Sequence, residues 1–152
     1  MKHLIVILSF ISVAFCNQYT FLVNKYDKEI ELEAKIILKI ATSSLNKKDV
    51  ALYIPEISQS EKEIYSKFFT LTNSCDKANF VFVKKTIDLT VECQEQEKLF
   101  FTNNYQKLML DKRYFGAFFW NKSRPNMVFI KNRIERQKVE LPHEYEQFVE
   151  DF

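Results

Sequence analysis

The sequence predicts a single α/β domain in which helices cover the faces of a largely parallel β-sheet. Short apolar runs alternate with amphipathic helical segments along most of the chain, which is the order of elements found in parallel sheets. The 152-residue length, with 47% apolar and 28% charged residues, suits one globular core. Near the C-terminal end, two aromatic and β-branched runs separated by polar residues and a proline predict an antiparallel β-hairpin, followed by two short helices.

The first sixteen residues have the pattern of a secretory signal peptide. A basic start precedes an uninterrupted apolar run over residues 4–15, and the chain turns polar after Cys16. This run is shorter than the about 20 residues that a membrane-spanning helix needs. We therefore expect export to the periplasm with cleavage after Ala14 or after Cys16, which leaves residues 17–152 as one mature domain. An uncleaved anchor and a lipid-modified Cys16 are the alternatives.

Export also sets the expected state of the cysteines. If Cys16 is removed, Cys75 and Cys93 remain, and in an oxidising compartment we expect a disulfide between them. Each cysteine precedes a predicted strand, so the two lie side by side if those strands are parallel neighbours. Closing a loop of this length stabilises the fold by on the order of 3 kcal/mol. Two buried free thiols are the alternative.

The clearest helix is predicted from Asp27 to Leu45. Its apolar residues recur at spacings of three and four and share one face: Ile30, Ala34, Ile37, Ala41 and Leu45. Asp27 suits the N-cap, and glutamates at 29, 31 and 33 suit the positive end of the helix dipole. We therefore expect this helix to cover one face of the sheet.

Strands and helices alternate after this helix. An apolar run at 50–54 ends at Pro55 and predicts a buried strand, and the pattern from Ser60 to Glu63 predicts a capping box that opens a second helix. Further strands are predicted at Leu71, 79–83, 89–91 and 99–101.

The C-terminal third begins with a short helix predicted over 102–110, capped by Thr102 or an asparagine. The hairpin strands are predicted at 114–120 and 126–130. A helix is expected near 132–139, and Pro142 is well placed to open a last helix that carries Tyr145, Phe148 and Val149.

Several chemistries are excluded by residue counts. Gly116 is the only glycine, whereas phosphate-binding loops, dinucleotide fingerprints and nucleophile elbows need two or three. His143 is the only histidine of the mature chain, so a metal site built on paired histidines is not expected. The mature chain has 21 basic and 20 acidic residues that interleave along nearly every segment. We therefore expect no enzyme activity, no cofactor, no metal and no nucleic-acid partner.

The sequence leaves open whether the aromatic side chains of the hairpin are buried in the core or exposed on the surface. Neighbouring side chains alternate between the faces of a strand, so the aromatic residues between 114 and 120 point to both sides. Either helices cover both faces, or one face is an apolar surface for another molecule. The second reading gives a candidate partner surface made of Phe118, Trp120, Lys122 and Arg124. Polar residues at strand ends give a candidate ligand site, namely Lys84, Asn103 and Asn104.

The chain resembles the YfiR-like family of small exported α/β proteins. Four stretches carry the resemblance: AKIILKIATSSL, CDKANFVFV, FGAFFW and MVFIKNRIERQKVELPHEYEQFV. The last stretch has a strand with Phe129, Asn132 near its exit, a basic helix over 133–137, and an apolar-polar step at 139–141 that leads into a final helix.

The resemblance implies a non-enzymatic periplasmic regulator or sensor. Members of this family are often dimers and act on a membrane-bound signalling protein such as a diguanylate cyclase. The alternative is a periplasmic solute-binding module for a small ligand, for example an anion, because the layered α/β arrangement is similar to one lobe of such proteins.

Overall fold

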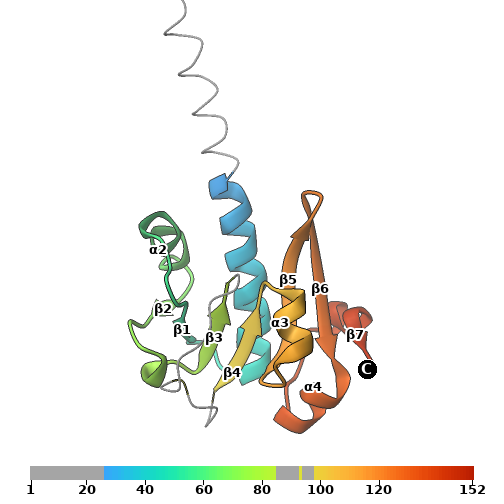
Figure 1. Cartoon of the computed structure of the whole chain (residues 1–152). Coiled ribbons are helices and arrows are strands. Elements are labelled where there is room, and N and C mark those ends of the chain that lie inside the picture. The colour runs from blue at the N-terminus through green and yellow to red at the C-terminus, as the bar shows by residue number, and fades with distance from the viewer. Residues whose placement is uncertain (1–25, 85–92, 94–97) are drawn as a thin grey trace, which may run out of the picture.

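The predicted α/β fold is confirmed. The computed structural model describes residues 26–84, 93 and 98–152, so the predicted signal peptide and the predicted strand at 89–91 lie outside the described residues. The described residues form a seven-stranded sheet in the order β2-β1-β3-β4-β5-β6-β7. Figure 1 shows the long first helix behind this sheet and α3 in front of it.

The sheet is parallel except for its last two strands. The strands are β1 (Ala51–Tyr53), β2 (Thr70–Leu71), β3 (Phe80–Val83), β4 (Leu99–Thr102), β5 (Tyr114–Asn121), β6 (Arg124–Ile130) and β7 (Val149–Glu150). The first five pair in parallel, β6 is antiparallel to β5, and β7 is parallel to β6. The prediction that Val149 belongs to a final helix is wrong, because Val149 pairs with Phe129 as an edge strand.

A helix occurs in each of the segments predicted to be helical, and the structure adds one short 3₁₀ helix that was not predicted. The first helix covers 26–45 of the described residues. The later helices are α2 (Gln59–Tyr65), the 3₁₀ helix η1 (Cys75–Lys77), α3 (Tyr105–Leu110), α4 (Lys131–Gln137) and the 3₁₀ helix η2 (His143–Phe148).

One predicted cap is misplaced by two residues. The capping box of α2 is formed by Ser58 and Glu61, not by Ser60 and Glu63. Both pairs have the required spacing of three, so the local pattern does not separate them. Glu61 also contacts a lysine on the sheet, and this tertiary contact favours the earlier frame. Asn104 caps α3, in agreement with one of the two expected caps.

Two apolar cores lie on opposite faces of the sheet. The larger core contains the inner face of the first helix, residues of α2, and Phe80, Phe82, Phe101, Phe115, Phe118 and Phe129. The smaller core contains Leu108 of α3, the two cysteines, and Tyr114, Ala117, Val128 and Ile130. Both faces of β5 are therefore covered over residues 114–118, whereas Phe119 and Trp120 are only partly buried.

A β-bulge in β5 distributes these aromatics. The pairing with β4 shifts by one residue, so that Phe100 lies opposite Tyr114 while Phe101 lies opposite Gly116. A Cβ on Gly116 would lie 2.6 Å from the ring of Phe129 and 2.7 Å from that of Phe101. The only glycine in the chain therefore leaves room for two aromatic rings on the larger core's side.

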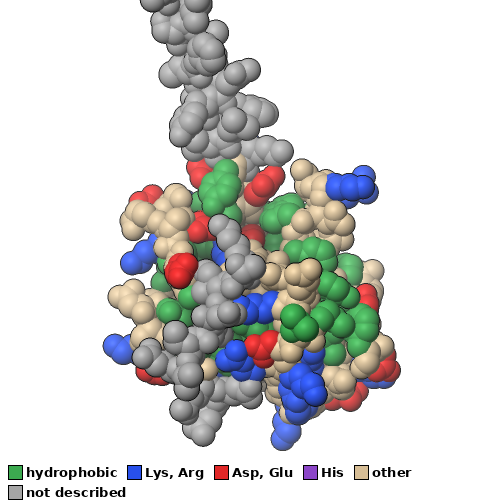
Figure 2. Space-filling view, viewed as in Figure 1, with side chains coloured by type: hydrophobic (Ala, Val, Ile, Leu, Met, Phe, Trp, Pro, Cys, Tyr) green, Lys and Arg blue, Asp and Glu red, His purple; other side chains and the backbone are tan. Residues whose placement is uncertain are grey.

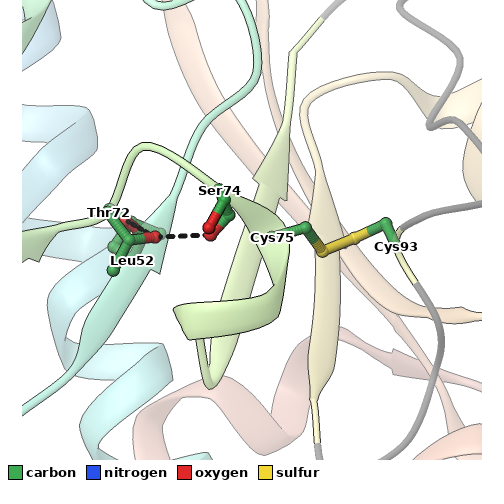
Figure 3. Close-up of a disulfide and its surroundings, with 5 residues drawn as sticks. All are labelled: Leu52, Thr72, Ser74, Cys75 and Cys93. Carbon is green, nitrogen blue, oxygen red and sulfur yellow. Dashed lines mark hydrogen bonds between the residues drawn. A yellow bond between two sulfur atoms is a disulfide. The ribbon is translucent and has the colours of Figure 1, made fainter.

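The predicted disulfide between Cys75 and Cys93 is confirmed (Figure 3). Cys75 begins η1 just before β3, and the two Cα atoms lie 5.4 Å apart. The preceding turn is held by Thr72, whose hydroxyl donates to the carbonyl oxygen of Ser74 at 3.0 Å. Because β3 and β4 are parallel neighbours, their leading ends bring the cysteines together, as the sequence predicts.

Candidate functional site

A buried cluster of charges joins three elements at the carboxyl end of β3. Lys84 directly follows β3, Glu33 lies on the first helix, and Glu61 lies on α2. The Lys84 Nζ atom is 2.6 Å from Oε1 of Glu33 and 2.8 Å from Oε1 of Glu61. The side chains of Lys84 and Glu33 are 9% and 3% exposed. Such burial is tolerated only because each charge has a partner.

Aromatic groups complete this cluster. The hydroxyl of Tyr65 donates a hydrogen bond of 2.6 Å to Oε1 of Glu33. The Lys84 ammonium lies 5.1 Å from the ring centre of Tyr65 and 5.7 Å from that of Phe82, within the range of cation–π attraction. Glu33 therefore accepts from two donors inside an apolar environment.

The cluster perturbs the ionisation of its members. Burial alone would lower the pKa of Lys84, but the charges and hydrogen bonds of Glu33 and Glu61 raise it above its ordinary value. Burial would raise the pKa of Glu61, but hydrogen bonds from Lys84 and Ser58 lower it. Burial and the neighbouring Glu33 carboxylate raise the pKa of Tyr65. These shifts favour the charged forms of Lys84 and Glu61 and the neutral form of Tyr65.

The predicted ligand residues have internal partners in the structure. Lys84 is directed into the charged cluster and not toward a surface ligand. Asn104 uses its side-chain oxygen to cap α3 through the backbone N–H of Lys107 at 3.1 Å. The backbone N–H of Asn103 donates to the carbonyl oxygen of Val83 at 3.2 Å. The structure therefore brings Lys84 and Asn103 to the ends of neighbouring strands. The side chains of Lys84 and Asn104, however, make contacts that stabilise the fold.

A surface pocket of about 230 Å³ lies at the carboxyl ends of β1 and β2. It is lined by Tyr53, Ile54, Glu56, Ile57, Lys62, Leu71, Thr72 and Asn73. Open α/β sheets bind ligands at the carboxyl edge of the sheet, and this pocket lies there between β1 and the edge strand β2. Sequence reasoning missed this pocket, because only the pairing of two short strands places Asn73 beside Tyr53.

The hairpin tip is the second candidate site. Lys122 and Ser123 form the two-residue turn, with φ angles of 48° and 60°. Lys122 and Arg124 are exposed, and Trp120 is partly buried against Phe118, with ring centres 5.6 Å apart. Figure 1 shows the hairpin extending beyond the neighbouring strands, and Figure 2 shows Lys or Arg side chains at its tip.

One residue of the predicted partner surface does not reach the surface. Phe118 is 0% exposed and belongs to the larger core, because Phe118 shares a face of β5 with the residues that meet the first helix. The exposed part of the predicted surface is therefore limited to Trp120, Lys122 and Arg124.

Two further searches give negative results for the described residues. No group of three or more His, Cys, Asp or Glu side chains within them is arranged to hold a metal ion. Within 26–84, 93 and 98–152, no helix combines the length and apolar character needed to cross a membrane.

Comparisons with known proteins add no relative. No family model, no curated protein and no solved structure matches the chain. The class defined by the fold and the two candidate sites is a disulfide-bonded α/β domain with a charged, projecting hairpin.

Proposed function

We propose that this protein is an exported, non-enzymatic regulatory module that acts on a membrane-bound signalling protein through its hairpin tip. The signal-peptide pattern and the disulfide support export to an oxidising compartment, the periplasm. The resemblance to the YfiR-like family supports a partner such as a diguanylate cyclase, and a homodimer as the working form.

The conformation of the turn is the observation that carries this proposal. A two-residue hairpin turn with positive φ at both positions favours Asn-Gly, and a side chain such as lysine costs about 1 kcal/mol there. Non-glycine residues with positive φ also occur singly at Asn46, Glu56 and Lys138, but Lys122 and Ser123 are consecutive. The chain retains a charged, unfavourable turn at an exposed point, which is typical of a contact site.

Charge complementarity indicates the kind of surface that the tip contacts. Lys122 lies in the turn and Arg124 directly follows it, and both are exposed. Guanidinium and ammonium groups bind carboxylates through charge-assisted hydrogen bonds. The tip therefore suits an acidic patch on the periplasmic part of the signalling protein.

Affinity capture from detergent-solubilised membranes of the producing cells tests this proposal. The wild-type protein should recover an integral signalling protein, and the Lys122→Glu/Arg124→Glu variant should recover at least tenfold less, because two like charges would then face the acidic patch. The matched control is Lys47→Glu/Lys48→Glu, which changes two exposed lysines after the first helix. Equal recovery by all three proteins would exclude the tip as the contact.

The pocket at β1 and β2 favours a second function, a solute-binding module. Its lining combines apolar residues such as Tyr53 and Leu71 with the opposite charges of Lys62 and Glu56, which suits a small zwitterion such as an amino acid. A panel of amino acids should then raise the melting temperature in proportion to the logarithm of ligand concentration. Asn73→Trp, which fills the pocket, should abolish the shift, and a flat panel for the wild-type protein rejects this function.

A further inference from the structure

Helix α3 exposes three large apolar side chains. Tyr105 is 41% exposed, Met109 is 37% exposed and Leu110 is 86% exposed. Tyr105 and Met109 are four residues apart and therefore lie on one flank of the helix, where the Tyr105 ring is 5.9 Å from that of Phe119. Tyr105 and Met109 thus form an apolar flank of α3, and Leu110, on the outward side of the helix, is the most exposed of the three.

A buried arginine fixes this helix in place. Nη1 of Arg133 donates to the carbonyl oxygens of Leu108, Asp111 and Tyr114, at 2.6, 3.0 and 2.8 Å. Leu108 and Asp111 lie at the C-terminal end of α3, where helix carbonyl groups need partners outside the helix, and Tyr114 is the first residue of β5. Leu108 is fully buried beneath the helix. Leu110 is therefore held outward by a rigid frame.

The surroundings of α3 are basic. Between residues 98 and 138 the chain has ten Lys or Arg residues and two acidic residues. Of the ten, Arg133 is buried, Lys122 and Arg124 lie at the hairpin tip, and Lys112 is exposed directly after α3. Arg136 reaches the end of α3, where its Nη2 donates to the carbonyl oxygen of Lys112 at 2.8 Å. Figure 2 shows hydrophobic side chains over α3 and the adjoining hairpin, with Lys and Arg side chains beside and below them.

We propose that this α3 surface, defined as Tyr105, Met109 and Leu110 with Lys112 and Arg136, docks on an anionic lipid bilayer. A bilayer offers an anionic headgroup layer above an apolar layer, and protruding apolar side chains beside basic ones match both layers. Leu110 and Met109 are aliphatic, which favours insertion among lipid chains over the base stacking that nucleic acids require. The proposal goes beyond the contact made by the hairpin tip and does not depend on it.

Flotation of the exported protein with lipid vesicles tests the proposal. The protein should float with vesicles of phosphatidylcholine mixed with phosphatidylglycerol, and much less with vesicles of phosphatidylcholine alone. High salt should weaken the binding because it screens the headgroup charges. Absence of binding to the mixed vesicles, or equal binding to both compositions, overturns the proposal.

Matched variants locate the contact. Leu110→Ser should weaken binding to mixed vesicles roughly tenfold, because the apolar surface that this leucine buries among the lipid chains is lost. Lys112→Glu/Arg136→Glu should weaken it at least as much. Leu32→Ser, at a 43% exposed leucine of the first helix, is the control and should bind like the wild type. An equal loss in Leu32→Ser, or no loss in Leu110→Ser, overturns the assignment to α3.

The two proposals fail separately. Capture of a signalling protein is measured in detergent, where no bilayer remains, so Leu110→Ser should leave that capture unchanged. Each variant is first checked for an unchanged melting temperature, because substitutions of exposed side chains usually alter stability little. If Leu110→Ser loses the folded state along with vesicle binding, the Lys112→Glu/Arg136→Glu variant decides whether the α3 surface binds the vesicles.

Discussion

The ammonium nitrogen of Lys84 lies 2.6 Å from Oε1 of Glu33, and both side chains are almost completely buried between the sheet and the first helix. Glu61 supplies a second carboxylate at 2.8 Å. Glu33 therefore connects the first helix to Lys84 at the end of β3. It is not one of the solvent-exposed charges in the first turns of that helix. The cluster makes the packing of three elements depend on one lysine.

Replacing Lys84 should therefore destabilise the fold strongly. Lys84→Met leaves two carboxylates close together with no cation between them, and breaking a buried pair in this way costs about 3–5 kcal/mol. Urea unfolding measures the loss. The control is Lys77→Met, at an exposed lysine of η1, which should change stability by less than about 0.5 kcal/mol.

A variant that lacks all three charges is a second test of the same explanation. Glu33→Gln/Glu61→Gln/Lys84→Met should be more stable than Lys84→Met alone, because no unpaired charge stays buried. If Lys84→Met unfolds at the same urea concentration as the wild type, the cluster has no structural role.

Stability should also depend on pH through this cluster. The pKa of Glu61 is below its ordinary value of 4.5, so its contribution is complete above about pH 4.5 and is lost as the pH falls through the folded-state pKa. The pKa of Lys84 is above its ordinary value of 10.5, so its contribution is complete below about pH 10.5 and is lost as the pH rises further.

Urea unfolding across the pH range checks both limbs. We expect a plateau near neutral pH with losses at both ends, and the acid loss should be shallower in Glu61→Gln. Asp111, whose pKa Arg113 also lowers despite partial burial, contributes to the same acid limb. Asp111→Asn is therefore the comparison, and an unchanged acid limb in Glu61→Gln would contradict the assignment.

The disulfide should contribute on the order of 3 kcal/mol, as expected for closing a loop between cysteines 18 residues apart. Cys75→Ser/Cys93→Ser should lose this amount in urea unfolding, and a reducing agent should then have no further effect. Cys16→Ser is the control. Two titratable thiols in exported Cys16→Ser protein would show that the disulfide does not form.

Gly116→Ala should be destabilising although alanine is small. Its Cβ would lie closer than 3 Å to the rings of Phe129 and Phe101, and forced repacking of a filled core costs about 1–3 kcal/mol. In a double-mutant cycle measured by thermal unfolding, Phe129→Leu should reduce the cost of Gly116→Ala. Additive losses would mean that the two side chains do not collide.

The hairpin turn should gain stability when its residues suit its geometry. Lys122→Asn/Ser123→Gly should stabilise the protein by about 1 kcal/mol, because both positions have positive φ. Lys138→Gly, at the left-handed C-cap of α4, is a comparison that should also stabilise. A lower melting temperature in the turn variant would show that Lys122 and Ser123 make stabilising contacts.

Much of this architecture was accessible from local patterns. The spacing of Ile30, Ala34 and Ile37 predicts the first helix, and these residues are buried as expected. The apolar runs before and after Cys93 predict β3 and β4, whose parallel pairing makes the disulfide reasonable. Each of these features depends on residues within a few helical turns or one strand, a range over which hydrophobic periodicity and capping determine the local structure.

The candidate sites were less accessible for a physical reason. Lys84 and Asn104 were both predicted to bind a ligand, yet their roles depend on Glu33, which is 51 positions before Lys84, and on the start of α3. Asn73 and Tyr53 share a pocket only after two short strands have paired. Contacts between distant segments leave no local pattern in one sequence.

The sequence alone predicted most of the order of the elements, the alternation that makes the sheet largely parallel, and a disulfide between Cys75 and Cys93 as the expected state, but not the edge strand β7. Only the tertiary structure decided that Phe118 is core and that Leu110 is surface, because the bulge at Gly116 and the anchoring of α3 by Arg133 assign these residues to opposite environments. An apolar side chain has the same hydropathy in either place. Which one it occupies depends on the elements that pack against it.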